Sequence, residues 1–289
     1  MALPLSQLVA PGWRWWTPEM EVPLPRPPHV SGLQHKCTWR QMAYNSSYSM
    51  CVREGEDKIS RTIMSRGAFE GCSRLPSIWA SSASTKPARS DIFLELGGNI
   101  GACTLEMLVK TNARVIVLEP SPANLYYLMS TLHAAHAAGT LARGRVLVLP
   151  YAASDKNGTS TLYAAKNNAG NSVIGVQVKD YKTQDMTSER YRVHVVPLDT
   201  LFPSLDVRLA KIDVQGFECR AIRGMRSLVN SGSVGTIKVE LAARWLTRQG
   251  CAVDTIWDLI EGAGFLVDDR CAAIDACRPY CDLPPRRAL

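Results

Sequence analysis

The stretch FLELGGNIGA, residues 93–102, joins an apolar run to three glycines and one asparagine. A strand that ends in a glycine-rich turn and opens a helix brings backbone N–H groups to the positive helix terminus, which favours an anionic or strongly polar ligand. The next apolar run, RVIVLE, ends in Glu119, 22 residues after Gly97. That spacing is typical of the acid that binds ribose hydroxyls in nucleotide-binding βαβ units. The loop and the acid together predict an adenosine-type ligand.

The order of the glycines narrows the class of ligand. A dinucleotide-binding loop reads G-x-G-x-x-G, and its second glycine makes room for the pyrophosphate. Neither Gly97 nor Gly98 has a glycine two positions later, and Asn99 places a side chain where a pyrophosphate needs space. The G-x-x-x-x-G-K-[ST] pattern of P-loop proteins is also missing from the sequence. We therefore expect adenosine without pyrophosphate, as in S-adenosylmethionine, with loop amides and Glu95 available to its carboxylate and ammonium.

Strand-like and helix-like segments alternate around this loop. The runs DIFLEL, RVIVLE, RVLVLP, RLAKID and GTIKVE are mostly separated by segments of helical period, which begin near Ile100, Pro122, Phe217 and Val253. This alternation predicts the α/β class, with a mostly parallel sheet covered by helices on both faces. Between the third and fourth runs, TSTLYAA, SVIGVQV and YRVHVV predict a small inserted β segment of antiparallel strands.

We divide the chain into three regions. Residues 1–36 contain seven prolines and three tryptophans, which forbids a continuous helix and predicts an extended arm that docks on the protein itself or on a protein partner. Residues 37–90 form an N-terminal cap region, in which residues 57–67 predict a short helix closed by Gly67. Residues 91–289 form the main domain, and we assign no function to its cysteine-rich tail.

Composition excludes several classes of protein. The 289 residues are 46% apolar, enough for one α/β domain of roughly 200 residues plus an extension. The net charge of +7 comes from scattered basic residues, which argues against nucleic-acid binding on charge alone. No stretch reaches the roughly 18 apolar residues of a transmembrane helix, so we expect a soluble protein. The N-terminus fits a secretory signal poorly, and its lack of acids before Glu19 leaves organelle targeting open.

The cysteines leave the compartment open. Three of the nine lie close together near the C-terminus, at Cys271, Cys277 and Cys281. Their spacing lacks a CxxC pair, so we predict no metal site there. A disulfide among them, or with Cys37, Cys51 or Cys72, is expected if the compartment is oxidising. Sequons at Asn45 and Asn157 also fit a lumenal protein, so cytoplasmic, organellar and lumenal locations all stay open.

Residues 91–241 contain five motifs in a fixed order: ELGGNIG, VLEPSPANLYYL, AASDKNGTSTLY, AKIDVQGFE and IKVE. Together they resemble the motifs of the FkbM-type family of S-adenosylmethionine-dependent methyltransferases. Residues 50–71 also resemble the segment before the core in eukaryotic relatives. The resemblance implies a Rossmann-like class I methyltransferase with a seven-stranded sheet. It further implies O-methylation of a hydroxyl on a sugar, glycan or other small molecule, with S-adenosyl-L-methionine as cofactor. A family resemblance supplies the type of reaction and leaves the acceptor open.

The resemblance assigns cofactor contacts residue by residue. It implies that Glu95, Gly97, Asn99 and Gly101 contact the methionine end of the cofactor. Glu119 would bind the ribose, with Asn124 close by, and Ser154 and Asp155 would lie beside the adenine. Three positions depart from the family pattern. Glu95 stands where Asp is commoner, Gly98 stands where Ala is commoner, and Gln215 replaces a usual Glu, which removes one negative charge near the expected reaction centre.

Candidate catalytic residues lie at the ends of adjacent central strands. Methyl transfer from a sulfonium is an in-line displacement, so the protein aligns the acceptor and takes up its proton. Asp213 is expected either to act as a base while the new bond forms or to cap the next helix, and Lys211 to pair with an acid. Glu240 is the third candidate. Asp213 and Glu240 also resemble positions that hold a divalent ion in catechol-type O-methyltransferases, but we predict no metal.

Two other interpretations stay open. The fold could serve as a structural or assembly subunit with weak or no catalysis, as Gln215 and the arm of residues 1–36 would allow. RNA methylation is indicated only by the pI near 9.0. The missing Asn/Asp-Pro-Pro-aromatic motif argues against base methylation and leaves ribose 2′-hydroxyls as acceptors. The histidines form no catalytic pattern: we expect His133 and His136 to be ordinary helix residues, and His194 to lie on an inserted strand.

Overall fold

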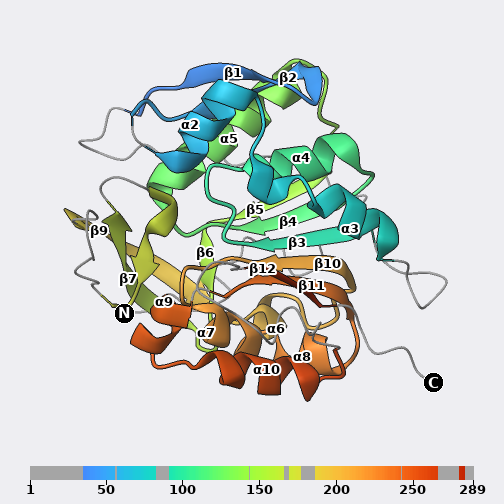
Figure 1. The fold of residues 1–289 in the computed structure, drawn as a ribbon, viewed down its shortest axis with the longest axis vertical. Coiled ribbons are helices and arrows are strands. Elements are labelled where there is room, and N and C mark those ends of the chain that lie inside the picture. The colour runs from blue at the N-terminus through green and yellow to red at the C-terminus, as the bar shows by residue number, and fades with distance from the viewer. Residues whose placement is uncertain are drawn as a thin grey trace.

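The structure is a computed structural model, shown in Figure 1. It describes residues 35–55, 57–82, 91–142, 144–165, 169–176, 186–241, 243–265 and 280–283. Nearly all of the predicted N-terminal arm therefore lies outside the described residues, as do Cys271 and Cys277 of the tail. The predicted boundaries after residues 36 and 90 stay predictions.

A mostly parallel sheet forms the centre of the molecule. Its strands are β3 (Ile92–Leu96), β4 (Arg114–Leu118), β5 (Val146–Leu149), β10 (Val207–Ile212), β11 (Val234–Glu240) and β12 (Tyr280–Leu283). Their spatial order is β12-β11-β10-β3-β4-β5, and only β12 runs antiparallel to its neighbour. The predicted α/β class is confirmed. The described residues supply six strands to this sheet, so the count of seven is not confirmed.

Helices cover both faces of the sheet, as Figure 1 shows. Phe93 of β3 contributes to the core under α4 (Ala102–Lys110) and α5 (Pro122–Ala137). Its neighbour Leu94 belongs to the opposite core, which includes α7 (Glu218–Arg223), α8 (Arg226–Asn230) and α10 (Val253–Glu261). Successive side chains of a strand point to opposite faces, so a strand buried along its whole length, such as β3, needs two covering layers. The short helices α6 (Leu198–Leu201) and α9 (Ala243–Arg248) complete the second layer.

A cap packs on the α4 and α5 side of the sheet. It consists of β1 (Thr38–Met42), β2 (Asn45–Val52), α2 (Lys58–Arg66), η2 (Glu70–Cys72) and α3 (Leu75–Ser81). The carboxylate of Asp57 accepts a hydrogen bond from the backbone N–H of Ser60 at 2.8 Å and so caps α2. The helix ends at Gly67, whose φ of 66° is left-handed. The predicted helix closed by Gly67 is therefore confirmed.

A second sheet lies beside the carboxyl ends of the central strands. It contains β6 (Tyr151–Ala153), β7 (Gly158–Ala165), β8 (Val173–Ile174) and β9 (Met186–Val196), in the order β6-β9-β7-β8. Strand β7 runs antiparallel to β8 and β9, as the sequence predicts for the inserted segment, whereas β6 runs parallel to β9. Residues 169–171 form a short 3₁₀ turn, η3 (Ala169–Asn171), between β7 and β8.

Three disulfides join segments of the described chain. Cys37 pairs with Cys51 inside the cap, Cys72 of η2 pairs with Cys103 of α4, and Cys219 of α7 pairs with Cys251. The expectation that Cys37, Cys51 or Cys72 pairs with a C-terminal cysteine is therefore wrong, and the sequence did not single out Cys103, Cys219 and Cys251. The pairing of Cys72 fastens the cap to the first turn of α4, directly after the glycine loop. None of the helices among the described residues is long and apolar enough to span a membrane.

Removing the bond between cap and α4 should weaken the fold. The Cys72–Cys103 bond spans 31 residues, and a crosslink over a loop of that length typically adds about 3 kcal/mol to the free energy of unfolding. We expect the Cys72→Ala/Cys103→Ala double variant to lose about this much in urea denaturation without reductant. With dithiothreitol the two proteins should become nearly equal. Equal stability without reductant would show that the bond does not stabilise the fold.

Candidate functional site

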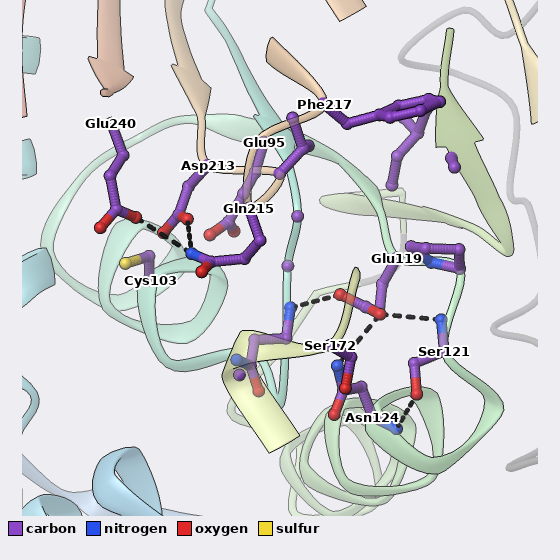
Figure 2. Close-up of a pocket in the computed structure, with 18 of the residues that line it drawn as sticks. Glu95, Cys103, Glu119, Ser121, Asn124, Ser172, Asp213, Gln215, Phe217 and Glu240 are labelled. Atoms are coloured by element: carbon purple, nitrogen blue, oxygen red, sulfur yellow. Dashed lines mark hydrogen bonds between the residues drawn. The ribbon is translucent and has the colours of Figure 1, made fainter. Parts of the chain in front are cut away.

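A cavity of about 170 Å³ opens at the carboxyl ends of the central strands. Its walls come from the β3–α4 loop, the ends of β4, β10 and β11, the cap, and the second sheet. In an open α/β sheet, this edge is the usual position of a ligand. Figure 2 shows two groups of polar side chains here, one around Glu119 and one around Asp213 and Glu240.

The glycine loop is shaped by close backbone contacts. A Cβ atom at Gly97 would lie 1.9 Å from the backbone oxygen of Asp213, so no other residue fits there unless the backbone moves. Gly97 and Asn99 both have left-handed backbone angles, with φ of 89° and 50°. For a residue with a side chain this conformation is strained, and it persists only where the surroundings fix it. The Asn99 side chain helps by accepting a hydrogen bond from the N–H of Ile100 at 2.8 Å.

Glu119 connects this loop to the first turn of α5. One carboxylate oxygen accepts from the N–H of Asn99 at 2.7 Å. The other accepts from the N–H of Ser121 at 2.8 Å and from the side-chain amide of Asn124 at 3.1 Å. Burial raises the pKa of Glu119, while these hydrogen bonds act in the opposite direction. A carboxylate has about four lone-pair sites, so roughly one remains for a ligand hydroxyl. A second site becomes available if the Asn124 amide releases its hydrogen bond to Glu119.

The cap extends to this region through Arg53, which the sequence analysis missed. Its guanidinium donates to the side-chain oxygen of Asn124 and lies 4.7 Å from the ring centroid of Tyr127. The contact fixes which end of the Asn124 amide faces Glu119. No local pattern marks Arg53, because only the tertiary packing of β2 brings it beside α5.

Apolar side chains form the wall that faces the second sheet. Ala152, Leu162, Ile174 and Phe217 belong to one buried cluster, and all four line the cavity together with Tyr151. Phe217 marks only a helix start in the sequence, yet its ring lies at one end of the cavity in Figure 2. A wall of this kind can contact the face of a flat aromatic ring.

Lys211 lies between two acids at the other end of the cavity. Its ammonium is 3.4 Å from Glu95 and 3.2 Å from Asp213. The second oxygen of Glu95 accepts from the Thr104 hydroxyl at 2.6 Å. Burial raises the pKa of Glu95, and Lys211 opposes that shift. Lys211 therefore pairs with both acids, and each oxygen of Glu95 has a partner within the protein.

Asp213 and Glu240 form a pair bridged by Gln215. The Gln215 amide nitrogen lies 2.8 Å from Asp213 and 3.3 Å from Glu240. Burial and the negative charge of Asp213 raise the pKa of Glu240 to about 10. Burial acts in the same direction on Asp213, but Lys211 and hydrogen bonds from Glu240, Gln215 and Lys211 together lower its pKa to about 2. At neutral pH Asp213 is thus ionised and Glu240 holds the proton.

Most of the predicted site residues lie at one place. Eight of them line the cavity: Glu95, Gly97, Asn99, Glu119, Asn124, Lys211, Asp213 and Glu240. Gly101 instead begins α4 and faces Leu128, where an added Cβ would approach to 3.0 Å. Asn171 and Ser172 of the inserted segment line the cavity as well.

Ser154 and Asp155 follow β6 and lie outside the cavity lining, so their contact with adenine stays a prediction. The Ser154 carbonyl lies against Gly224, where any Cβ would be 1.8 Å from it. Asp155 instead forms an ion pair with Arg220 at 3.2 Å. His194 is also absent from the lining and packs edge-on against Tyr151. Among the described residues, no group of three or more His, Cys, Asp or Glu side chains is arranged to hold a metal ion.

Comparison with known proteins places these features in a wider context. The family model described as "Methyltransferase FkbM domain" matches residues 95–267. No curated protein sequence matches the chain significantly.

Three solved structures show similarity at low sequence identity. The methyltransferase FkbM from Methylobacillus flagellatus is 15% identical with a TM-score of 0.43, over 72% of this chain and 50% of that one. The precorrin-6y C5,15-methyltransferase from Geobacter metallireducens is 12% identical with a TM-score of 0.36, over 76% and 78%. Phosphoethanolamine N-methyltransferase 2 from Haemonchus contortus, in complex with S-adenosyl-L-methionine, is 10% identical with a TM-score of 0.35, over 68% and 37%. The matched part of the M. flagellatus protein is half of its length.

The contact between Gly97 and Asp213 can be tested by Gly97→Ala. We expect a larger loss of unfolding free energy than for Gly139→Ala. Gly139 also has a left-handed φ, of 70°, but nothing lies within 4 Å of an added Cβ. The control should lose about 1–2 kcal/mol from backbone strain alone. Urea denaturation measures both, and an equal loss would contradict the close approach.

The protonated state of Glu240 gives a second test. Its pKa is about 10 in the folded chain against 4.5 ordinarily, so between these values the folded state keeps a proton that the unfolded state releases. Stability should therefore fall as pH rises through this interval. Glu240→Gln mimics the protonated acid and does not titrate, so its Tm relative to wild type should increase from pH 5 to pH 9. Parallel Tm curves would contradict the assignment, and Glu261→Gln on the surface serves as control.

Proposed function

The chain belongs to the FkbM methyltransferase family, whose model matches residues 95–267, and on that premise we propose that it is an S-adenosylmethionine-dependent O-methyltransferase. The acceptor would be a hydroxyl of a sugar, glycan or other small molecule. One observation carries the proposal: a single cavity combines the left-handed glycine loop, the Glu119 carboxylate, an apolar wall and the Asp213–Glu240 pair. In this proposal these parts would bind an adenosyl group and hold a proton acceptor beside it.

The residues of the cavity fit the proposed cofactor in chemical type. Glu119 would bind the ribose hydroxyls, and Phe217 with Leu162 would contact the adenine. The loop from Gly97 to Asn99 would contact the methionine end. Glu95 is already paired with Lys211 and Thr104, so in this proposal it holds Lys211 in place. At about 170 Å³ the cavity is smaller than the roughly 300 Å³ of ordinary ligand sites, and the ligand would extend through its opening.

The acid pair defines how the protein would take up the acceptor proton. When bound, the cofactor supplies an electrophilic methyl group. Asp213, with its pKa of about 2, is far too weak a base to deprotonate an alcohol in advance. The hydroxyl becomes strongly acidic only while its oxygen forms the new bond, and at that stage an ionised carboxylate can accept the proton. Asp213 would thus accept the proton late in the transfer. Glu240, which is already protonated, would stabilise the ionised Asp213 carboxylate by a hydrogen bond before that step.

The assembly-subunit interpretation has no specific observation in its favour. The arm that motivates it lies almost wholly outside the described residues, and Gln215 lies inside the cavity with all three catalytic candidates. A non-catalytic subunit would have no need to keep both groups of polar side chains at one opening. Methyl transfer to an acceptor would distinguish the two interpretations, and a failure to bind the cofactor would exclude the catalytic one.

Glu119→Gln should weaken cofactor binding. The variant keeps the shape of the side chain but replaces one acceptor oxygen by a donor and removes the charge. Because hydrogen bonds to charged groups contribute about 1.5–3 kcal/mol, we expect affinity for S-adenosylhomocysteine to fall by about 10- to 100-fold. Isothermal titration calorimetry measures this, and Glu261→Gln should bind like wild type. If folded wild-type protein binds neither S-adenosylmethionine nor S-adenosylhomocysteine, the proposed function fails.

A further inference from the structure

Gln215 adopts a backbone conformation that its surroundings enforce. Its φ is 53°, and Asn99 is the other residue besides glycine with positive φ in the described part of the chain. The next residue, Gly216, is pressed against the backbone of Trp245, where an added Cβ would lie 2.9 Å from the carbonyl oxygen. A left-handed non-glycine residue costs of order 1 kcal/mol or more and tends to occur at functional sites. The strained turn directs the Gln215 side chain into the cavity, where its amide nitrogen contacts both acids (Figure 2).

The side-chain amide of Gln215 bridges carboxyls from neighbouring strands. Its nitrogen is 2.8 Å from Oδ1 of Asp213, which follows β10, and 3.3 Å from Oε2 of Glu240, at the end of β11. An amide nitrogen has two N–H donors and no charge. One group can therefore hold both carboxyls without neutralising either of them.

The charges around the pair explain why an uncharged bridge is sufficient. Lys211 of β10 contacts Asp213 at 3.2 Å, and it also pairs with Glu95 of β3. Glu218 of α7 is the further acid that acts on both members of the pair, and its own pKa is raised to about 7, chiefly by burial. With one proton on Glu240, the pair carries a single negative charge opposite one ammonium. Two ionised carboxylates at this separation would instead require another cation.

We propose that Gln215 is a positioning residue. Its amide bridges Asp213 and Glu240 at the place where an oxygen-ligand site would hold a divalent cation. The acid pair therefore works with an amide bridge and needs no divalent metal. The role of Gln215 in methyl transfer rests on the proposed function. The amide bridge between Asp213 and Glu240 does not rest on it, and the bridge can be tested without an acceptor substrate.

A single substitution should convert the bridge into a cation site. Gln215→Glu removes the two donors and adds a third carboxylate beside Asp213 and Glu240. Clustered carboxylates repel one another, and hard divalent cations prefer such oxygen ligands. The variant should therefore bind Mn²⁺, whereas the wild-type amide, which presents N–H groups to both acids, should not.

The test is calorimetric titration of MnCl₂ into the full-length protein. We expect no saturable binding to wild type up to about 1 mM, and a site in Gln215→Glu that is at least about tenfold tighter. Gln41→Glu is the matched control, because Gln41 also donates its side-chain amide, in its case to the Ser46 carbonyl of the cap hairpin. This control should bind like wild type. Saturable Mn²⁺ binding to wild type with the affinity of the variant would overturn the proposal.

A second variant covers the case in which Gln215→Glu does not fold. Gln215→Gly suits the left-handed backbone and removes the amide. The hydrogen bond from Gln215 helps to lower the pKa of Asp213. In wild type, ionised Asp213 stabilises the fold above its ordinary pKa of 3.8, and this stabilisation is lost as pH falls towards about 2. Without the hydrogen bond from Gln215, this stabilisation should be smaller. The Tm difference from wild type should then be larger at pH 6 than at pH 3.

A merely structural role for Gln215 would give a Tm difference that does not change with pH, and that result would contradict the proposal. Calorimetry with S-adenosylhomocysteine runs alongside on the same proteins. If the wild-type protein does not bind S-adenosylhomocysteine, the proposed function is wrong. The Mn²⁺ and pH results still decide whether the amide bridge exists.

Discussion

The approach of Gly97 to the carbonyl of Asp213 fixes the geometry of the whole site. The backbone of the glycine loop lies so close to the end of β10 that a Cβ would be 1.9 Å from the Asp213 oxygen. The Asp213 N–H also donates to the Leu96 carbonyl at 3.0 Å. The loop that would hold the cofactor and the acid that would accept a proton are therefore parts of one rigid junction between β3 and β10. Alignment of reacting groups of this kind is the main contribution a protein makes to a displacement reaction.

The buried acids on the two sides of this junction are stabilised in different ways. Glu119 is buried but accepts from two backbone N–H groups and an amide, which replace lost water. Asp213, Glu240 and Glu95 share one buried cation, Lys211, and one proton. Gln215 links the pair without adding charge. At this end of the cavity the carboxyl groups therefore outnumber the buried cation.

Local sequence patterns predicted the parts of the fold that depend on local physics. Apolar runs of strand length identified the sheet, and the glycines identified the loop. The spacing from Gly97 singled out Glu119, which lines the cavity. Contacts made by tertiary packing were missed. Arg53 reaches Asn124 only because β2 packs on α5, and Cys103 meets Cys72 only because η2 lies over α4. Ser154 and Asp155 were placed by resemblance, and both lie outside the cavity lining.

A crystal structure with S-adenosylhomocysteine would test the central claim most directly, namely that this cavity holds an adenosyl cofactor with its sulfur facing the acid pair. The account predicts the ribose hydroxyls on Glu119, the adenine beside Phe217 and Leu162, and the sulfur directed towards Asp213 and Gln215. A ligand bound at another place, or one whose sulfur faces away from Asp213, would contradict it.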